Sequence, residues 1–283
     1  MPSPLPDPQT LAAAFEAACL AELQAIKPGN VHVFADGHNM VVDDFVKSAH
    51  AAASVIALQG LTVGQRILHA VEATWAAAGC NTNLGIVLLA APLLHSALSG
   101  RPLAEVLGRL TVEDASLAFR AILRASPAGL GNSPRHDVRQ TAQVTLLEAM
   151  CESATRDRIA YQYATAYEDV LGFAVPRYHE AYSRWGSANW ATTAVYLGLM
   201  ARFPDSHVMR KYGEASAASL RIQAEKYDRT LIESRNPEHC LDDLLGFDAG
   251  LKRQGLNPGT SADLTVATLL AVAIEKYLKP GSK

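Results

Sequence analysis

The chain has 283 residues, of which 49% are hydrophobic and 19% are charged, which is typical of a globular protein with a well-filled core. Its 25 basic and 28 acidic side chains give a net charge of −3, which argues against a broad nucleic-acid-binding surface. The four cysteines include no C-x-x-C pair, so they predict neither a disulfide framework nor a zinc site. The longest apolar window, residues 85–98, is about half of what a membrane span needs. We therefore expect a cytoplasmic protein with no membrane partner.

Alanine and leucine dominate the composition, with 48 and 35 residues respectively. Both residues rank high in helix propensity, whereas β-branched and aromatic residues are comparatively sparse. No segment alternates apolar and polar residues for long enough to predict a strand. The sequence predicts an all-α fold, a single compact bundle of about ten or more helices. One domain over residues 1–283, with residues 1–8 as an extended lead-in, is the simplest organisation.

Start and stop signals divide the chain into helices joined by turns. Asp7 is the predicted cap of the first helix, which runs to Ile26. Either Asp43 or Asp44 is the predicted cap of the second helix. Residues 81–83 precede an apolar helix that runs through residue 98, and the pattern at 111–114 is that of a capping box. The other predicted helices cover 62–78 and begin near residues 139, 155, 187, 206, 237 and 261.

The first polar turn is Lys27-Pro28-Gly29-Asn30-Val31-His32, followed by His38, Asn39 and the pair Asp43-Asp44. A Pro-Gly turn exposes backbone N–H groups, and a neighbouring lysine adds a positive charge that suits a phosphate. The same residues are also typical of an ordinary helix stop, because Pro-Gly turns are common. Spacing alone favours the helix stop.

Two further polar turns precede apolar helices. Gly79-Cys80-Asn81-Thr82-Asn83-Leu84-Gly85 places three polar side chains where one cap would suffice, which indicates a second use such as binding ligand oxygens. Asn257-Pro258-Gly259-Thr260-Ser261-Ala262-Asp263 offers Ser261 as a cap and Asp263 in the first turn, where the helix dipole favours a carboxylate. Asp263 could equally hold a divalent cation, with Ser261 facing a phosphate. Both alternatives stay open at this point.

A looser set of charged residues comprises Arg135-His136-Asp137, Asp157-Arg158 and Arg235-Asn236. Individually each is typical of a solvated surface, but together they supply the carboxylates and cations that a metal–triphosphate site needs. The sequence contains no G-x-x-x-x-G-K-[ST] motif, no G-x-G-x-x-G after a strand and no histidine pair at helical spacing. A P-loop, a Rossmann site and a helical zinc site are therefore not supported.

The three turns, in this order, resemble the triphosphoribosyl-dephospho-coenzyme A synthase family, whose members share K-P-G, N-T-x-x-G and P-G-x-S-A-D turns. The resemblance implies an all-helical enzyme that uses Mg²⁺ and ATP and transfers the triphosphoribosyl group to an acceptor hydroxyl with loss of adenine. It implies that Lys27 and Arg235 face phosphates, that Asp44 and Asp263 hold magnesium, and that Asn81 and Asn83 orient the ribose. Asp137, together with Asp44, is the catalytic candidate. The full nucleotide-contacting set is Lys27, Gly29, Asn30, His38, Asn81, Thr82, Asn83, Gly85, Arg235, Gly259 and Ser261.

The sequence departs from the family pattern at identifiable positions. Asn83 and Leu84 replace a histidine and a lysine, Asn39 replaces an aspartate, and residues 135–138 stand where a Gly-Arg-Gly-Glu-Ala stretch is expected. This resembles a divergent branch found in archaea and methylotrophic bacteria. The resemblance to the family implies dephospho-CoA as the acceptor, with a pterin-type ribitol precursor as the alternative. A non-catalytic nucleotide-binding helical protein is a further alternative, and a homodimer is left open.

Overall fold

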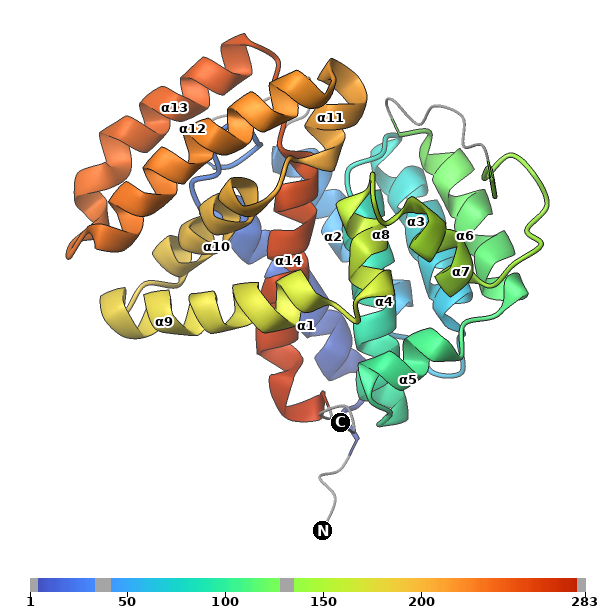
Figure 1. The fold of residues 1–283 in the computed structure, drawn as a ribbon. Helices are drawn as coiled ribbons and strands as arrows, with labels where there is room; N and C mark the ends of the chain where they lie inside the picture. The colour runs from blue at the N-terminus through green and yellow to red at the C-terminus, as the bar shows by residue number, and fades with distance from the viewer. Residues whose placement is uncertain (1–4, 34–41, 128–134, 279–283) are drawn as a thin grey trace.

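The computed structural model describes residues 5–33, 42–127 and 135–278. Helices make up most of this part of the chain, and no β-strand occurs in it (Figure 1). The predicted all-α fold is confirmed. None of the described helices is long and apolar enough to cross a membrane. The α-helices are α1 Pro8–Gln24, α2 Val42–Ile56, α3 Val63–Ala78, α4 Leu84–Ser99, α5 Leu103–Gly108, α6 Val112–Ala125, α7 Leu146–Ser153, α8 Arg158–Ala164, α9 Val175–Trp185, α10 Ala188–Arg202, α11 Ser206–Tyr212, α12 Glu214–Glu233, α13 Leu241–Arg253 and α14 Gly259–Ile274.

Local capping signals determine several of the helix starts. Asp7 caps α1 by accepting a hydrogen bond from the backbone N–H of Thr10, as predicted. Thr62 and Thr111 each form a capping box at the start of α3 and α6. Gly79 ends α3 in the left-handed conformation, with φ of 69°. These boundaries depend on contacts within one turn, which is why the sequence revealed them.

Other predicted boundaries are wrong. Asp43 and Asp44 lie in the first turn of α2 rather than before it, where the carboxylates face the positive end of the helix dipole. No helix begins near residue 139, because the chain turns at 137–144 and the capping box of Thr145 starts α7. The helix predicted from residue 155 is divided into α8, a π-helix at Glu168–Ala174 and α9. Gly213, with φ of 87°, divides the helix predicted from residue 206 into α11 and α12.

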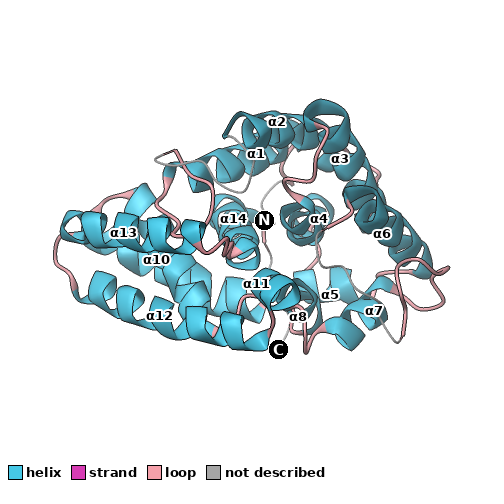
Figure 2. Ribbon diagram, turned by 90° about the horizontal axis from the view of Figure 1, so that it is seen from above, coloured by secondary structure: helices cyan, strands magenta, loops and turns pink. Residues whose placement is uncertain are grey.

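The buried hydrophobic residues form two clusters, one among α1–α8 and one among α10, α12 and α13. Helices α10 and α14 contribute to both clusters. Figure 2 shows α14 and α4 side by side between the two groups of helices, and these two are among the most apolar helices of the chain. The seam between the clusters therefore runs along α14. The prediction of a single domain is not tested by this arrangement and stays a prediction.

Pro92 lies inside α4 and removes one of its backbone hydrogen bonds, because proline has no N–H to donate to the carbonyl of Leu88. The hydroxyl of Tyr163 donates to this Leu88 carbonyl at 2.6 Å, and the hydroxyl of Tyr167 donates to that of Leu89 at 2.7 Å. Both tyrosines are fully buried. The two bonds fasten α8 and the turn after it to α4, and they bring the N-terminus of α8 close to that of α4.

Candidate functional site

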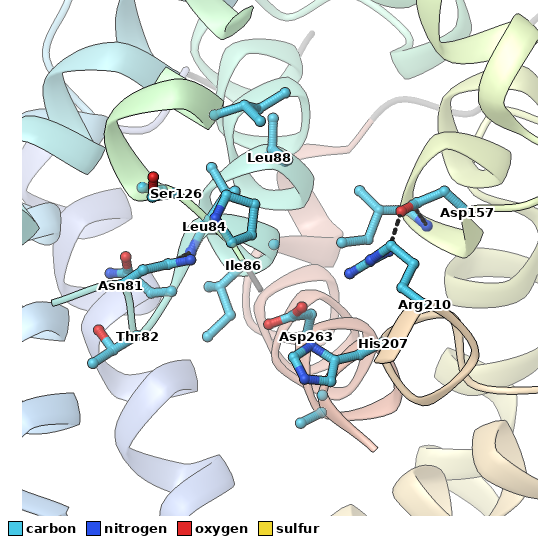
Figure 3. A pocket seen from close by; sticks show the side chains of 18 of the residues that line it. Asn81, Thr82, Leu84, Ile86, Leu88, Ser126, Asp157, His207, Arg210 and Asp263 are labelled. Carbon is cyan, nitrogen blue, oxygen red and sulfur yellow. Dashed lines mark hydrogen bonds and ion pairs between the residues drawn. The ribbon is translucent and has the colours of Figure 1, made fainter. Parts of the chain in front are cut away.

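A pocket of about 870 Å³ opens where the N-termini of α4, α8, α11 and α14 approach one another (Figure 3). This volume lies in the range typical of small-molecule sites. Figure 3 shows Leu84 and Leu88 on one side of the pocket and the ion pair of Asp157 and Arg210 on the other, and Trp75 also lines the pocket. Eight residues of the predicted nucleotide-contacting, metal and catalytic sets line it: Asn30, Asn81, Thr82, Asn83, Gly85, Asp137, Gly259 and Asp263.

The second polar turn, residues 79–85, forms one wall of the pocket and also has structural duties. The side-chain oxygen of Asn81 accepts a hydrogen bond from the Leu84 N–H at 3.2 Å, so Asn81 satisfies the first N–H of α4, although Asn83 holds the N-cap position. Asn83 donates to the hydroxyl of Thr74 at 2.9 Å, and the Thr82 hydroxyl donates to that of Ser48 at 2.6 Å. All three side chains therefore hold the turn in place, and all three also line the pocket.

Asp205 joins the third turn to α11, a role that the sequence did not reveal. One of its oxygens caps α11, and the other accepts hydrogen bonds from the backbone N–H and the hydroxyl of Ser261, at 2.8 and 2.9 Å. Ser261 is fully buried and is not among the residues that line the pocket. Gly259 does line the pocket, beside the ring of His207.

Asp263 presents its carboxylate to the pocket from the first turn of α14 (Figure 3). It makes no hydrogen bond or ion pair with any residue in the described ranges. Burial, together with the charges of Asp205 and Glu22, raises its pKa well above the ordinary value. A Cβ atom added at Gly85 would overlap this carboxylate and lie 2.5 Å from its Cγ, so the glycine is what lets α4 and the carboxylate approach each other.

The first turn packs beneath the pocket, and Lys27 is not among the residues that line it. Lys27 is fully buried and forms an ion pair with Glu22, which itself lines the pocket. Gly29 has φ of 83°, donates its N–H to Asp248 at 2.8 Å and lies against Pro258 of the third turn. Of this turn only Asn30 reaches the pocket. His38 lies outside the described residues.

Two further predicted residues do not line the pocket. Asp44 lies in the first turn of α2, and it is not part of the lining although Phe45 is. Arg235 is exposed in the segment after α12, which leads away from the pocket. The phosphate and magnesium roles expected for these residues thus have no support in the arrangement of the described side chains.

The cationic side of the pocket comes from residues that the sequence analysis did not select. Arg156 precedes α8, and His207, Arg210 and Lys211 belong to α11. The guanidinium of Arg210 donates to Asp157 at 2.6 Å, and Asp157 in turn caps α8 (Figure 3). These residues are typical of an exposed helix, and only the packing of α11 against α8 makes them part of a site.

The described residues contain no group of three or more His, Cys, Asp or Glu side chains that could hold a metal ion alone. Mg²⁺ is usually bound by one or two carboxylates together with substrate phosphates and water. A single pocket-facing carboxylate without a partner, Asp263, fits a metal ion that arrives with a nucleotide. Asp263 also has the charged neighbours that a cation would neutralise.

The model of the ATP:dephospho-CoA triphosphoribosyl transferase family matches residues 8–282. The chain belongs to this family. Among known transferases of this kind, a 2-(5''-triphosphoribosyl)-3'-dephosphocoenzyme-A synthase assigned in Acinetobacter calcoaceticus is 26% identical over 115 residues, which are 40% of this chain and 38% of that protein. The aligned segment is thus well under half of that relative's length.

The crystal structure assigned to a triphosphoribosyl-dephospho-CoA synthase from Archaeoglobus fulgidus has the same fold. It superimposes with a TM-score of 0.61 and 23% identity over 82% of this chain and 98% of that chain. Membership of the transferase family confirms the resemblance that the three polar turns indicated. The roles expected for individual site residues stay predictions.

Proposed function

We propose that the protein transfers the triphosphoribosyl group of ATP to a hydroxyl group of dephospho-CoA, with release of adenine and dependence on Mg²⁺. The family match supports the reaction type. The observation that carries the proposal is a single pocket whose lining combines apolar side chains, several cations and the Asp263 carboxylate. An adenine ring fits against Trp75 and Leu88, and the triphosphate fits the cations Arg156, Arg210 and Lys211.

The proposed reaction forms a bond between the acceptor oxygen and ribose C1′ and breaks the bond between C1′ and adenine. The electron pair of the broken bond leaves with adenine, and the proton lost by the hydroxyl balances the one that adenine takes up. The transition state carries positive charge at C1′, as in glycoside hydrolysis. Magnesium, when bound, neutralises the phosphate oxygens, and Asp263 is the residue that would hold it.

Asp137 is the proposed base that accepts the hydroxyl proton. It lines the pocket, and its carboxylate is held by the backbone N–H of Arg139 at 2.9 Å and by the Arg139 guanidinium. A carboxylate that lines the pocket and is held in a fixed position suits proton transfer, which contributes about 10²–10⁴ in rate. Asn81 and Asn83 remain the residues proposed to orient the ribose.

The test is incubation of the purified protein with ATP, Mg²⁺ and either dephospho-CoA or a pterin-type ribitol precursor, with free adenine and product mass as readouts. We expect adenine release with dephospho-CoA, lost on addition of EDTA. Asp137→Asn should lower kcat about 10²–10⁴-fold with little change in the Kd for ATP. Asp243→Asn, at an exposed carboxylate of α13, is the matched control.

The outcomes separate the alternatives. Release only with the ribitol precursor would change the acceptor but keep the transfer. Binding of Mg-ATP without adenine release with any acceptor would contradict the transferase proposal and favour a nucleotide-binding protein. A thermal-shift assay distinguishes a transferase or a nucleotide-binding protein from a protein that lacks this site, because bound nucleotide raises Tm by mass action. The cytoplasmic location and the homodimer stay predictions.

A further inference from the structure

Glu22, near the end of α1, is a buried carboxylate that faces the pocket and has no part in the reaction as proposed above. It is 5% exposed and lines both the main pocket and a cavity of about 10 Å³ behind it. Thr82 and Asn83 line the same two cavities. Glu22 therefore lies beside the second polar turn.

Lys27 binds Glu22 from the first polar turn. Its ammonium is fully buried, forms a hydrogen-bonded ion pair with Glu22 Oε1 and donates a second bond of 3.1 Å to Asn30 Oδ1. Burial raises the pKa of Glu22 and lowers that of Lys27, and the pairing opposes both shifts. A buried ion pair is often no more stabilising than apolar side chains of the same shape. Stability of the fold therefore does not account for the pair.

The pairing leaves one oxygen of Glu22 for the pocket. Lys27 takes Oε1, whereas Oε2 makes no hydrogen bond with any residue of the described ranges. Asn30 Nδ2 donates to Asn257 Oδ1 at 2.7 Å, which ties the first turn to the third. The Glu22 carboxylate is thus fixed at the place where the three polar turns meet, with one acceptor oxygen unused.

We propose that Glu22 Oε2 accepts a hydrogen bond from the ribose 2′-hydroxyl of the donor nucleotide, and that Lys27 is the positioning residue that holds this carboxylate. The inference rests on the proposed ribosyl transfer. Carboxylates are recurrent partners of ribose hydroxyls in nucleotide sites. The 2′-hydroxyl lies next to the carbon that becomes positive, so a hydrogen bond to it strengthens in the transition state.

The test separates stability from recognition with three variants, Glu22→Gln, Lys27→Met and the double variant. Lys27→Met alone leaves a buried charge without its partner and should lower Tm by about 5–10 °C. The double variant replaces the ion pair by a neutral pair of similar size, and its Tm should return to within about 3 °C of the wild-type value. Each stable protein is then titrated with Mg-ATP, Mg-2′-deoxy-ATP and Mg-3′-deoxy-ATP.

The wild-type protein should prefer ATP over 2′-deoxy-ATP by about 10–100-fold in Kd and in kcat/KM, the range expected for a hydrogen bond to a charged group. In the double variant this ratio should fall below about threefold, whereas the preference over 3′-deoxy-ATP should be unchanged. The matched control is the double variant Arg177→Met with Asp228→Asn, which neutralises a partly buried ion pair outside the pocket. It should keep the wild-type preference for ATP over 2′-deoxy-ATP.

A ratio that persists in the double variant, or a wild-type protein that binds both nucleotides equally, would overturn the role of Glu22. Absence of adenine release from the wild-type protein, with nucleotide binding intact, would instead contradict the proposed function. The Kd ratios still decide the role of Glu22 in that case, because they do not depend on turnover.

Discussion

Gly85→Ala is the substitution that most directly tests the position of the Asp263 carboxylate. The added methyl group would overlap that carboxylate and lie 2.8 Å from Cδ1 of Ile159. Overpacking costs about 1–3 kcal/mol, and alanine recovers about 1 kcal/mol of helix propensity. The free energy of unfolding should therefore fall by only about 0–2 kcal/mol. The group that gives way is the carboxylate, because both helix backbones are embedded in the core.

A displacement of about 1 Å at a reacting group can cost about 100-fold in rate. We therefore expect adenine release to fall at least that far, while Tm falls by about 4 °C or less. The matched control is Gly246→Ala in α13, where an added Cβ meets nothing within 4 Å, and it should leave activity unchanged and raise stability by about 0.5–1 kcal/mol. Gly85→Ala with more than a tenth of the wild-type rate would refute the reasoning.

Three further predictions concern the fold. Gly64→Ala should lower the free energy of unfolding by about 3 kcal/mol or more, as measured by chemical denaturation. The added Cβ would lie 2.6 Å from the backbone of Asp114, and a backbone atom cannot move aside as a flexible side chain can. Burial raises the pKa of Asp114, but hydrogen bonds, that from the Gly64 N–H foremost, outweigh it and lower the pKa. Asp114 should therefore stabilise the fold at pH values above its pKa in the unfolded chain, and this stabilisation should be lost as the pH falls through its lower pKa in the folded protein. The urea midpoint of an Asp114→Asn variant should accordingly depend less on acidic pH than the urea midpoint of the wild-type protein. Tyr163→Phe should lower the free energy of unfolding by about 1–3 kcal/mol, because it leaves the Leu88 carbonyl without a hydrogen-bond donor. The loss should be smaller in a Pro92→Ala background, where the N–H of residue 92 can donate to this carbonyl. An equal loss in both backgrounds would contradict this account.

The sequence predicted the elements whose causes are local. Asp7, Thr62 and Thr111 bond to backbone groups within three residues, and their signatures are visible without a structure. The division of the segment after residue 155 depends instead on Tyr163 and Tyr167, whose hydroxyls reach carbonyls 75 and 78 residues away. No local pattern indicates such a contact.

The same distinction applies to the site. The position of Asn81 at the pocket could be predicted because the turn at residues 81–83 has more polar side chains than capping requires, and Asp263 was the carboxylate that the third turn offered to a cation. The sequence predicts Lys27 to contact a phosphate because it shows the charge of this residue, but it shows neither its burial nor its ion pair with Glu22. Arg210 was missed because an arginine in a short polar helix is unremarkable until α11 packs beside α8.

Helix α14 carries Asp263 in its first turn and also forms part of the hydrophobic core. The later turns of α14, from Leu264 to Ile274, are buried in the larger hydrophobic cluster, and Ala262 in its first turn belongs to the smaller one. Helix α14 therefore cannot tilt or slide without disturbing the packing of both. The carboxylate is thus held by a rigid support before any substrate arrives, which is the arrangement that lowers the reorganisation needed during a reaction.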